Sequence, residues 1–188
     1  IAAALYSTKQ LNLLDKRFLA FHVSGGTTDA LLVNDEASDT LLPVKLVGKT
    51  LDLNAGQLVD RVGLMLSCQF PCGKELEKLA LQYDSDIKVK PTVKSSDCCL
   101  SGVENKCNKA LSDGKDAPYV AAMCLKYIEE TLFKMTENIL DTYGDIPVIF
   151  AGGVMSNSII RENLTKRLPL RIRAHLYALF RMCRFAFV

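Results

Sequence analysis

The sequence predicts an α/β protein in which a meander of strands is followed by helices and then by one more buried strand. Three observations support this class: apolar runs at 18–24 and 28–34 on either side of a glycine turn, a helical repeat over 116–143, and an unbroken apolar run at 146–151 that leads into two glycines. The chain has 188 residues, of which 49% are hydrophobic, so it is long enough to bury a core. We expect one domain or two small lobes.

Composition narrows the class of protein further. A formal net charge of +2 indicates neither a general polyanion binder nor an acidic one. No uncharged apolar run is as long as a membrane span, and residues 1–5 lack the basic flank of a signal peptide, so we expect a cytoplasmic protein with no membrane segment. The irregularly spaced cysteines favour free thiols over disulfides. The alternative is a zinc site, which no C-x-x-C pair supports. Its ligands would come from Cys68, Cys72, Cys98, Cys99 and Cys107.

The turn Val-Ser-Gly-Gly-Thr-Thr-Asp at 23–29 joins the first two predicted strands. Its paired glycines allow the backbone to approach a ligand closely, and its hydroxyls and free N–H groups are suited to phosphate. The alternative for this stretch alone is a tight hairpin that binds nothing.

The next elements are a third strand at 42–48 and a helix at 52–68. Asp52, Gly56 and Asp60 would share one stripe of that helix, with two carboxylates on either side of a gap. A glycine inside a helix costs about 1 kcal/mol relative to alanine, which favours something that packs or binds over it. A solvated acidic edge is the alternative. Before these elements, residues 1–6 are typical of the end of a helix.

The second half of the chain begins with a turn at 70–73, a short helix at 74–81 and a polar, loop-rich segment at 83–115. The lysines of that segment could meet an anionic partner or form a solvated face. A long helix over 116–143 is predicted to be capped by Asp116 and stopped by Gly144. The strand at 146–151 then leads through Gly152 and Gly153 into a helix that continues to Leu164. This junction favours an anion or a polar base edge, or serves only close packing.

Three segments, in this order, resemble the tRNA threonylcarbamoyl transferase family, formerly called O-sialoglycoprotein endopeptidases. Residues 23–29 are similar to the family turn V-S-G-G-H-T-Q. Residues 48–80 are similar to G-x-T-x-D-x-A-x-G-E-x-x-D-K and the P-G-G that follows it, and 151–161 are similar to A-G-G-V-x-x-N-x-x-L-R. The resemblance covers about residues 1–165, and three matches at plausible intervals are far more specific than one.

The resemblance implies the actin-like ATPase (ribonuclease H-like) fold, mainly its second lobe. Residues 1–17 would be the end of a truncated first-lobe helix and a linker, 18–165 the second lobe with an insertion at about 83–115, and 166–188 an atypical basic tail. The cleft would hold ATP or threonylcarbamoyl-adenylate, and the parent reaction is N6-threonylcarbamoylation of a tRNA adenosine. The implied contacts are Val23, Ser24, Gly25, Gly26 and Thr27 with phosphates, Asp60, Gly73 and Asn157 with the nucleoside or adenylate, and Gly152 and Gly153 on the adenosine side.

Departures from the family pattern indicate a divergent member. Thr27 replaces His, Asp29 replaces Gln, Gln57 replaces Glu and Cys72 replaces the first Gly of P-G-G. The change at 57 removes a charge from the cleft, so we assign no catalytic residue. The family metal, a divalent iron, zinc or magnesium ion, is held by an H-x-x-x-H pair and a later Asp that we expect to lie outside this chain. No metal ligand is therefore assigned.

The implied partners are tRNA, the protein subunits of the threonylcarbamoyl transfer complex and a second copy of the chain. Two other functions stay open: a non-catalytic nucleotide-binding scaffold that regulates or pairs with a true family enzyme, and a metalloprotease, for which no H-E-x-x-H motif is present. The tail at 166–188 is either the product of a shifted reading frame near residue 165 or a basic amphipathic helix that meets RNA or a partner.

Overall fold

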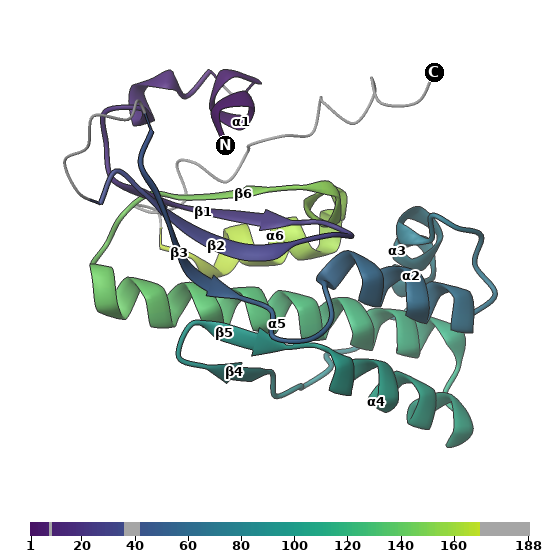
Figure 1. The fold of residues 1–188 in the computed structure, drawn as a ribbon. Coiled ribbons are helices and arrows are strands. Elements are labelled where there is room, and N and C mark those ends of the chain that lie inside the picture. Colours follow the sequence, from purple (N-terminus) through teal and green to yellow (C-terminus); the bar gives the residue numbers. More distant parts are fainter. Residues whose placement is uncertain (8, 36–41, 170–188) are drawn as a thin grey trace.

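The computed structural model describes residues 1–7, 9–35 and 42–169, and most of the basic tail lies outside this range. Its centre is a four-stranded sheet with the order β3-β2-β1-β6 (Figure 1). β1 and β2 are antiparallel, as are β2 and β3, whereas β6 runs parallel to β1. The strands are β1 (Phe18–Val23), β2 (Thr28–Val33), β3 (Val44–Lys49) and β6 (Val148–Ala151).

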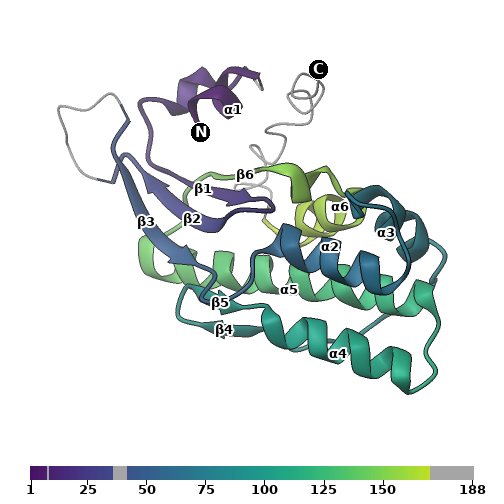
Figure 2. The ribbon, with the colours of Figure 1, turned by 45° about the vertical axis from the view of Figure 1, so that its right-hand side comes forward.

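Alternation along β1 divides the core into two layers. Leu19, Phe21 and Val23 point into the larger cluster, which includes the long helix α5 (Ala117–Tyr143), while Phe18 and Ala20 point to the other face. Figures 1 and 2 show α5 running across one face of the sheet, with α1 (Ala2–Ser7) above the other face. That second face also carries the short 3-10 helix η1 (Leu11–Leu13). The sheet therefore buries both faces, the one towards α5 far more extensively.

The long helix begins and ends as predicted. The Asp116 carboxylate accepts a hydrogen bond from the Tyr119 N–H at 3.0 Å, which satisfies one of the free donors of the first turn. Gly144 follows the last helical residue with φ of 81°, a conformation that glycine adopts without strain. Among the described residues, no helix is both long and apolar enough to cross a bilayer.

The helix predicted from residue 52 begins later, because α2 spans Ala55–Met65 and Asn54 is its N-cap. The predicted stripe is therefore wrong for Asp52, which lies outside the helix. Its carboxylate instead accepts hydrogen bonds from the Leu100 N–H at 2.7 Å and from the Ser101 hydroxyl, at the start of α4 (Ser101–Ser112). Asp52 thus caps a helix that is distant in sequence.

The segment 83–115 contains more regular structure than the loop-rich stretch we predicted. It holds the hairpin of β4 (Thr92–Lys94) and β5 (Asp97–Cys99), followed by the 12-residue helix α4. The helical pattern of α4 is weak because only Val103 and Cys107 are fully buried along it. Its cap comes from Asp52, so the local sequence carries no start signal. The short helix predicted at 74–81 is α3 (Gly73–Ala80).

Replacing Asp52 by asparagine is expected to cost about 1–2 kcal/mol of unfolding free energy at pH 7, because the amide group that replaces one carboxylate oxygen cannot accept the hydrogen bonds from Ser101. Burial alone would raise the pKa of Asp52, but hydrogen bonds from the Ser101 side chain and from the Leu100, Leu53 and Ser101 amides lower it overall. A lowered pKa in the folded state means that this stabilisation is present at neutral pH and is lost as the pH falls below about 4. Urea unfolding at pH 7 and at pH 3 measures both effects.

The matched control is Asp113→Asn, because Asp113 follows the same helix and, within the described residues, its side chain makes no hydrogen bond. We expect little change for it at either pH. An Asp52→Asn variant that is as stable as the parent at pH 7 would contradict the capping role.

Candidate functional site

A cavity of about 620 Å³ opens where the turn after β1 meets α2, α3 and the start of α6 (Ser158–Arg167). β1 and β6 are parallel, so their carboxyl ends, Val23 and Ala151, lie at the same edge of the sheet. Ligands of α/β sheets are commonly bound at that edge. The glycine turn follows β1 there, and the 3-10 helix η2 (Gly153–Ser156) follows β6.

The glycine turn is held in one conformation by its own hydrogen bonds. The Ser24 N–H donates to the Thr27 carbonyl at 2.7 Å, and the two hydroxyls lie 3.2 Å apart. The Gly26 N–H lies 3.3 Å from the Ser24 hydroxyl oxygen, which accepts from it. Gly25 is exposed and lines the cavity, whereas Val23 is fully buried in β1. The turn therefore presents backbone rather than side chains to the cavity.

Gly56 is the residue on which the turn rests. A Cβ atom at this position would lie 2.5 Å from the Gly25 nitrogen and 2.7 Å from the Ser24 carbonyl carbon. The Gly56 N–H also donates to the Ser24 carbonyl at 3.0 Å. The glycine inside α2 is thus explained by close approach of the turn, and Thr28 adds to this contact by accepting from the Ala55 N–H at 2.9 Å.

Asp60 and Gly73 lie on the next wall of the cavity. The Asp60 carboxylate accepts from the Cys72 N–H at 2.9 Å, just before Gly73 begins α3. A carboxylate at the start of a helix interacts favourably with the partial positive charge of its N-terminus. Asp60 is half-buried, so its carboxylate is fixed in position at the edge of the cavity and stays accessible from it.

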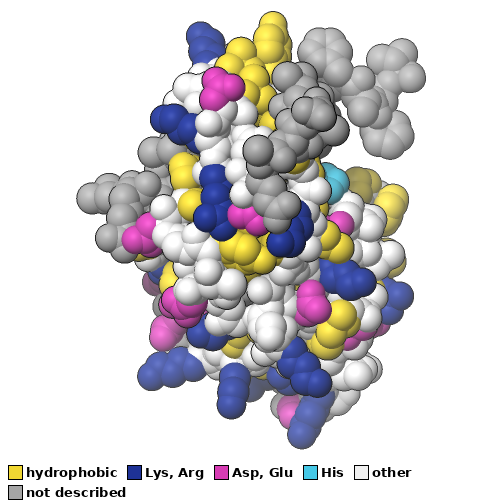
Figure 3. All heavy atoms as spheres, turned by 60° about the vertical axis from the view of Figure 1, so that its left-hand side comes forward, with side chains coloured by type: hydrophobic (Ala, Val, Ile, Leu, Met, Phe, Trp, Pro, Cys, Tyr) yellow, Lys and Arg dark blue, Asp and Glu magenta, His cyan; other side chains and the backbone are white. Residues whose placement is uncertain are grey.

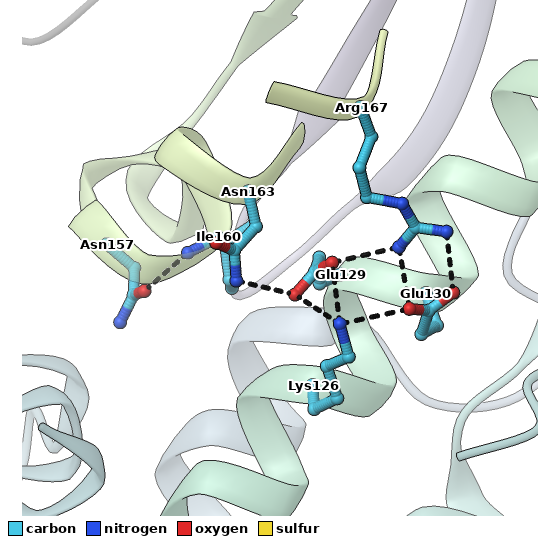
Figure 4. A network of polar contacts seen from close by, with 7 residues as sticks. All are labelled: Lys126, Glu129, Glu130, Asn157, Ile160, Asn163 and Arg167. Carbon is cyan, nitrogen blue, oxygen red and sulfur yellow. Dashed lines mark hydrogen bonds and ion pairs between the residues drawn. The ribbon is translucent and has the colours of Figure 1, made fainter. Parts of the chain in front are cut away.

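The opposite wall comes from the segment after β6. Gly152 has φ of 107° and packs against the Val23 backbone, while Gly153 lines the cavity. The Asn157 side chain accepts from the Ile160 N–H at 3.0 Å and so caps α6, as Figure 4 shows. Asn157 is 8% exposed and its side chain lines the cavity.

The structure thus brings together residues from four separate segments of the predicted site. Those that line the cavity are Gly25, Asp60, Gly73, Gly153 and Asn157. Those that lie behind it and shape the turn and the sheet edge are Val23, Ser24, Gly26, Thr27 and Gly152.

Several lining residues of α3 were missed by the sequence reasoning. The Glu77 carboxylate accepts hydrogen bonds from the Ser158 N–H at 2.7 Å and from its hydroxyl, which joins α3 to α6 across the cavity. Lys74 and Lys78 lie one helical turn apart on the same wall, next to Phe70. The four-residue spacing of the lysines was the available signal, but a lysine pair on a short helix is usually no more than a solvated face.

Gln57, which replaces a family Glu, lies away from the lining residues. Its side-chain oxygen accepts from the Asn54 N–H at 3.2 Å in a capping box at the start of α2. The side chain at 57 therefore serves the cap of α2, where glutamate and glutamine are both suited, and it is not a lining residue from which the cavity described here would lose a charge.

The part of the chain that the structure describes offers no group of three His, Cys, Asp or Glu side chains suited to a metal ion. The family metal therefore has no fitting set of ligands here, and we assign it no step. The described cysteines are free thiols, in agreement with the prediction, and burial raises the pKa of Cys98 to about 12.

Comparison with known proteins identifies the relatives of this chain. Residues 2–183 match the family model for TsaD, the tRNA N6-adenosine threonylcarbamoyltransferase. The enzyme of that name from Thermococcus kodakarensis is 30% identical over 161 residues, which cover 84% of this chain and 46% of the relative. The one from Kosmotoga olearia is 32% identical over 155 residues, 79% of this chain and 45% of the relative. The chain thus spans about half the length of these relatives.

A solved structure supports the fold independently. Component A of the (R)-2-hydroxyglutaryl-CoA dehydratase of Acidaminococcus fermentans superposes with a TM-score of 0.52 at 14% sequence identity, over 87% of this chain and 57% of that one. This likeness concerns the fold alone and confirms the actin-like ATPase class. The fold and the match over almost the whole chain lead to one conclusion: this chain belongs to the tRNA N6-adenosine threonylcarbamoyltransferase (TsaD) family.

Proposed function

We propose that this chain is a divergent, partial family member that binds ATP or threonylcarbamoyl-adenylate in the cavity between the glycine turn, α2, α3 and α6. The observation that carries the proposal is the convergence of five predicted contact residues, from four separate segments, on that one cavity. In the parent reaction, the threonylcarbamoyl group of the adenylate is transferred to N6 of a tRNA adenosine.

The chemistry of the walls suits such a ligand. The glycine turn exposes its backbone to the cavity with no side chain in between, so a phosphate group can come close to it. The Asp60 carboxylate is an acceptor for ribose hydroxyls, and the free amide nitrogen of Asn157 is a donor for a polar base edge. The proposal also includes the partners of the chain, which are tRNA, the other subunits of the transfer complex and a second copy of the chain. It includes a cytoplasmic location as well.

A non-catalytic scaffold is the second candidate. It is favoured by the substitution of Thr27 for the family His. Both candidates require a nucleotide in the cavity. Complementation of a strain that lacks the tRNA modification separates them, because only an active enzyme restores it.

Titration calorimetry with ATP and with a non-hydrolysable adenylate tests the shared site. We expect binding to the parent chain and a loss of about tenfold or more in affinity for Asp60→Asn, because hydrogen bonds to charged groups contribute about 1.5–3 kcal/mol. Asp113→Asn, on the far end of α4, is the matched control and should bind as the parent does. A correctly folded chain that binds neither ligand would contradict the proposal.

A further inference from the structure

Phe70 is the most exposed large side chain next to the cavity, with 71% of its surface open to solvent. Large aromatic side chains usually bury most of their surface, so an exposed one beside a cavity needs an explanation. Pro71 follows it directly and also lines the cavity, which restricts the backbone there. The ring therefore lines the cavity while most of its surface stays open to solvent.

Two lysine side chains line the same cavity as this ring. Lys74 and Lys78 are exposed, lie one turn apart on α3 and line the same cavity. Neither ammonium group makes an ion pair within the described part of the chain. Because no ion pair holds them, both ammonium groups stay available to a partner on this wall of the cavity.

The carboxylates of this wall are already engaged. Glu75 accepts from the Gln69 N–H at 2.9 Å, and Asp60 accepts from the Cys72 N–H at 2.9 Å. Glu77 accepts from Ser158. These three acidic side chains are half-buried, whereas the two lysines are exposed, so the lysines are the more accessible charged groups of this wall.

The glycine turn and the segment that follows Phe70 pack against different positions along α2. The turn packs on Gly56, while the segment that follows Phe70 packs on Gly63, where a Cβ atom would lie 2.2 Å from the Cys72 Cβ. These two glycines are seven residues apart, which is about 10 Å along a helix with a rise of 1.5 Å per residue. The phosphates of a nucleotide at the glycine turn would therefore lie about 10 Å along α2 from the position against which the segment after Phe70 packs. The Phe70 ring and the two ammonium groups line the cavity at a distance from that turn.

We propose that Phe70, Lys74 and Lys78 form a contact surface for single-stranded RNA, with an unpaired base stacked on the ring and neighbouring phosphates on the lysines. An exposed aromatic ring beside unpaired cations is the combination that binds unstacked nucleic acid. The inference rests on the proposed function, which requires an RNA adenosine to reach the ligand in this cavity, and it names the residues that would position that RNA.

The test uses the whole chain and a fluorescently labelled RNA stem–loop with an unpaired adenosine in its loop, measured by anisotropy. Replacing Phe70 by alanine should weaken RNA binding about tenfold, within the range for loss of one stacked base, while Phe70→Tyr should retain it. ATP affinity should fall much less than RNA affinity in Phe70→Ala, because this change removes none of the five lining residues predicted to contact the nucleotide. Leu64→Ala removes another exposed apolar side chain, one outside the cavity lining, and should leave both affinities unchanged.

The two lysines are tested separately, by the salt dependence of RNA affinity. Lys74→Gln and Lys78→Gln should each reduce the slope of log affinity against log salt by about 0.7, the value for one phosphate contact with a single strand. Lys109→Gln on α4 is the charge-matched control and should leave the slope unchanged. A fully paired duplex should bind the parent more weakly than the stem–loop, because its bases are not free to stack.

The outcomes separate this inference from the proposed function. If the chain binds ATP but not the stem–loop, or if Phe70→Ala leaves RNA binding intact, the contact surface is wrong and the nucleotide site stands. If Phe70→Ala weakens ATP instead, the ring stacks on the small ligand and the inference is again wrong. RNA binding that depends on Phe70, in a chain that does not bind ATP, would support the surface and contradict the nucleotide site.

Discussion

Replacing Glu129 by alanine is expected to lower the free energy of unfolding by about 3–5 kcal/mol, the cost of breaking a buried charge network by removing one partner. Glu129 is only 1% exposed, and both of its oxygens are occupied. One accepts from Lys126 at 3.0 Å and from Arg167 at 2.9 Å, and the other accepts from Lys126 at 3.2 Å and from Asn163 at 2.9 Å. Figure 4 shows these contacts joining α5 to α6.

The remaining partners explain why the loss is large. Without Glu129, two cations of the network face the single carboxylate of Glu130, which contacts Arg167 at 2.6 Å and Lys126 at 3.1 Å. Burial would raise the pKa of Glu130, but hydrogen bonds from Arg167 and then from Lys126 lower it overall. The stabilisation from Glu130 is therefore present at neutral pH and is lost as the pH falls below about 4.5.

The same helix provides the control. Glu137 pairs with Lys134 at 3.4 Å, and both side chains are close to half exposed, so Glu137→Ala should cost no more than about 0.5 kcal/mol. Chemical denaturation of the two variants measures the contrast, and similar losses for both would contradict the role of the buried network. Because α6 begins at the cavity-lining Asn157, Glu129→Ala should also weaken ATP binding at a temperature where the variant is still folded.

The sheet and the long helix could be predicted from sequence because their signals are local. The apolar run of β1, the Asp116 cap and the Gly144 stop each lie within or beside the element that they define. The glycine turn and the Gly152-Gly153 junction could be placed for the same reason. Their location at one sheet edge follows from the parallel pairing of β1 with β6, which the sequence did not predict and the structure shows.

Residues whose role depends on distant partners could not be assigned in this way. Asp52 looks like the first residue of α2, but its carboxylate caps α4, 48 positions away in sequence. The sequence correctly favours something that packs over Gly56, but it cannot identify the glycine turn as that partner. Lysines and lone aromatic residues such as Phe70 are common on surfaces, and only the cavity beside them gives their position a meaning.

The distribution of charge over a whole face of the molecule does not identify a binding surface either. Figure 3 shows Lys and Arg side chains intermixed with Asp and Glu over one side of the molecule, with hydrophobic groups between them. On such a face the balance of charge does not indicate a binding surface. The position of individual groups is more informative, since Lys74 and Lys78 line the cavity, which the sequence alone does not show.

Replacing Gly152 by alanine is expected to destabilise the fold by about 2–6 kcal/mol, the sum of two separate penalties. The first is conformational, because φ of 107° with ψ of 166° is a region that residues with a side chain rarely adopt. The second is steric: the added Cβ would lie 2.2 Å from the Val23 carbonyl oxygen and 2.7 Å from its carbonyl carbon. Backbone atoms of a central strand cannot move away without disturbing the sheet.

Alanine substitutions at two other glycines, Gly144 and Gly153, separate the conformational penalty from the steric one. Gly144 has φ of 81° but open space where a Cβ would lie, so Gly144→Ala measures the conformational cost alone. Gly153 has open space and no positive φ, so Gly153→Ala should leave stability nearly unchanged while adding a methyl group to a residue that lines the cavity. Thermal unfolding should rank Gly152→Ala as the least stable, then Gly144→Ala, then Gly153→Ala. If Gly152→Ala were no less stable than Gly144→Ala, the contact with Val23 would not limit this position, and the close approach of β1 to the glycine junction would need another explanation.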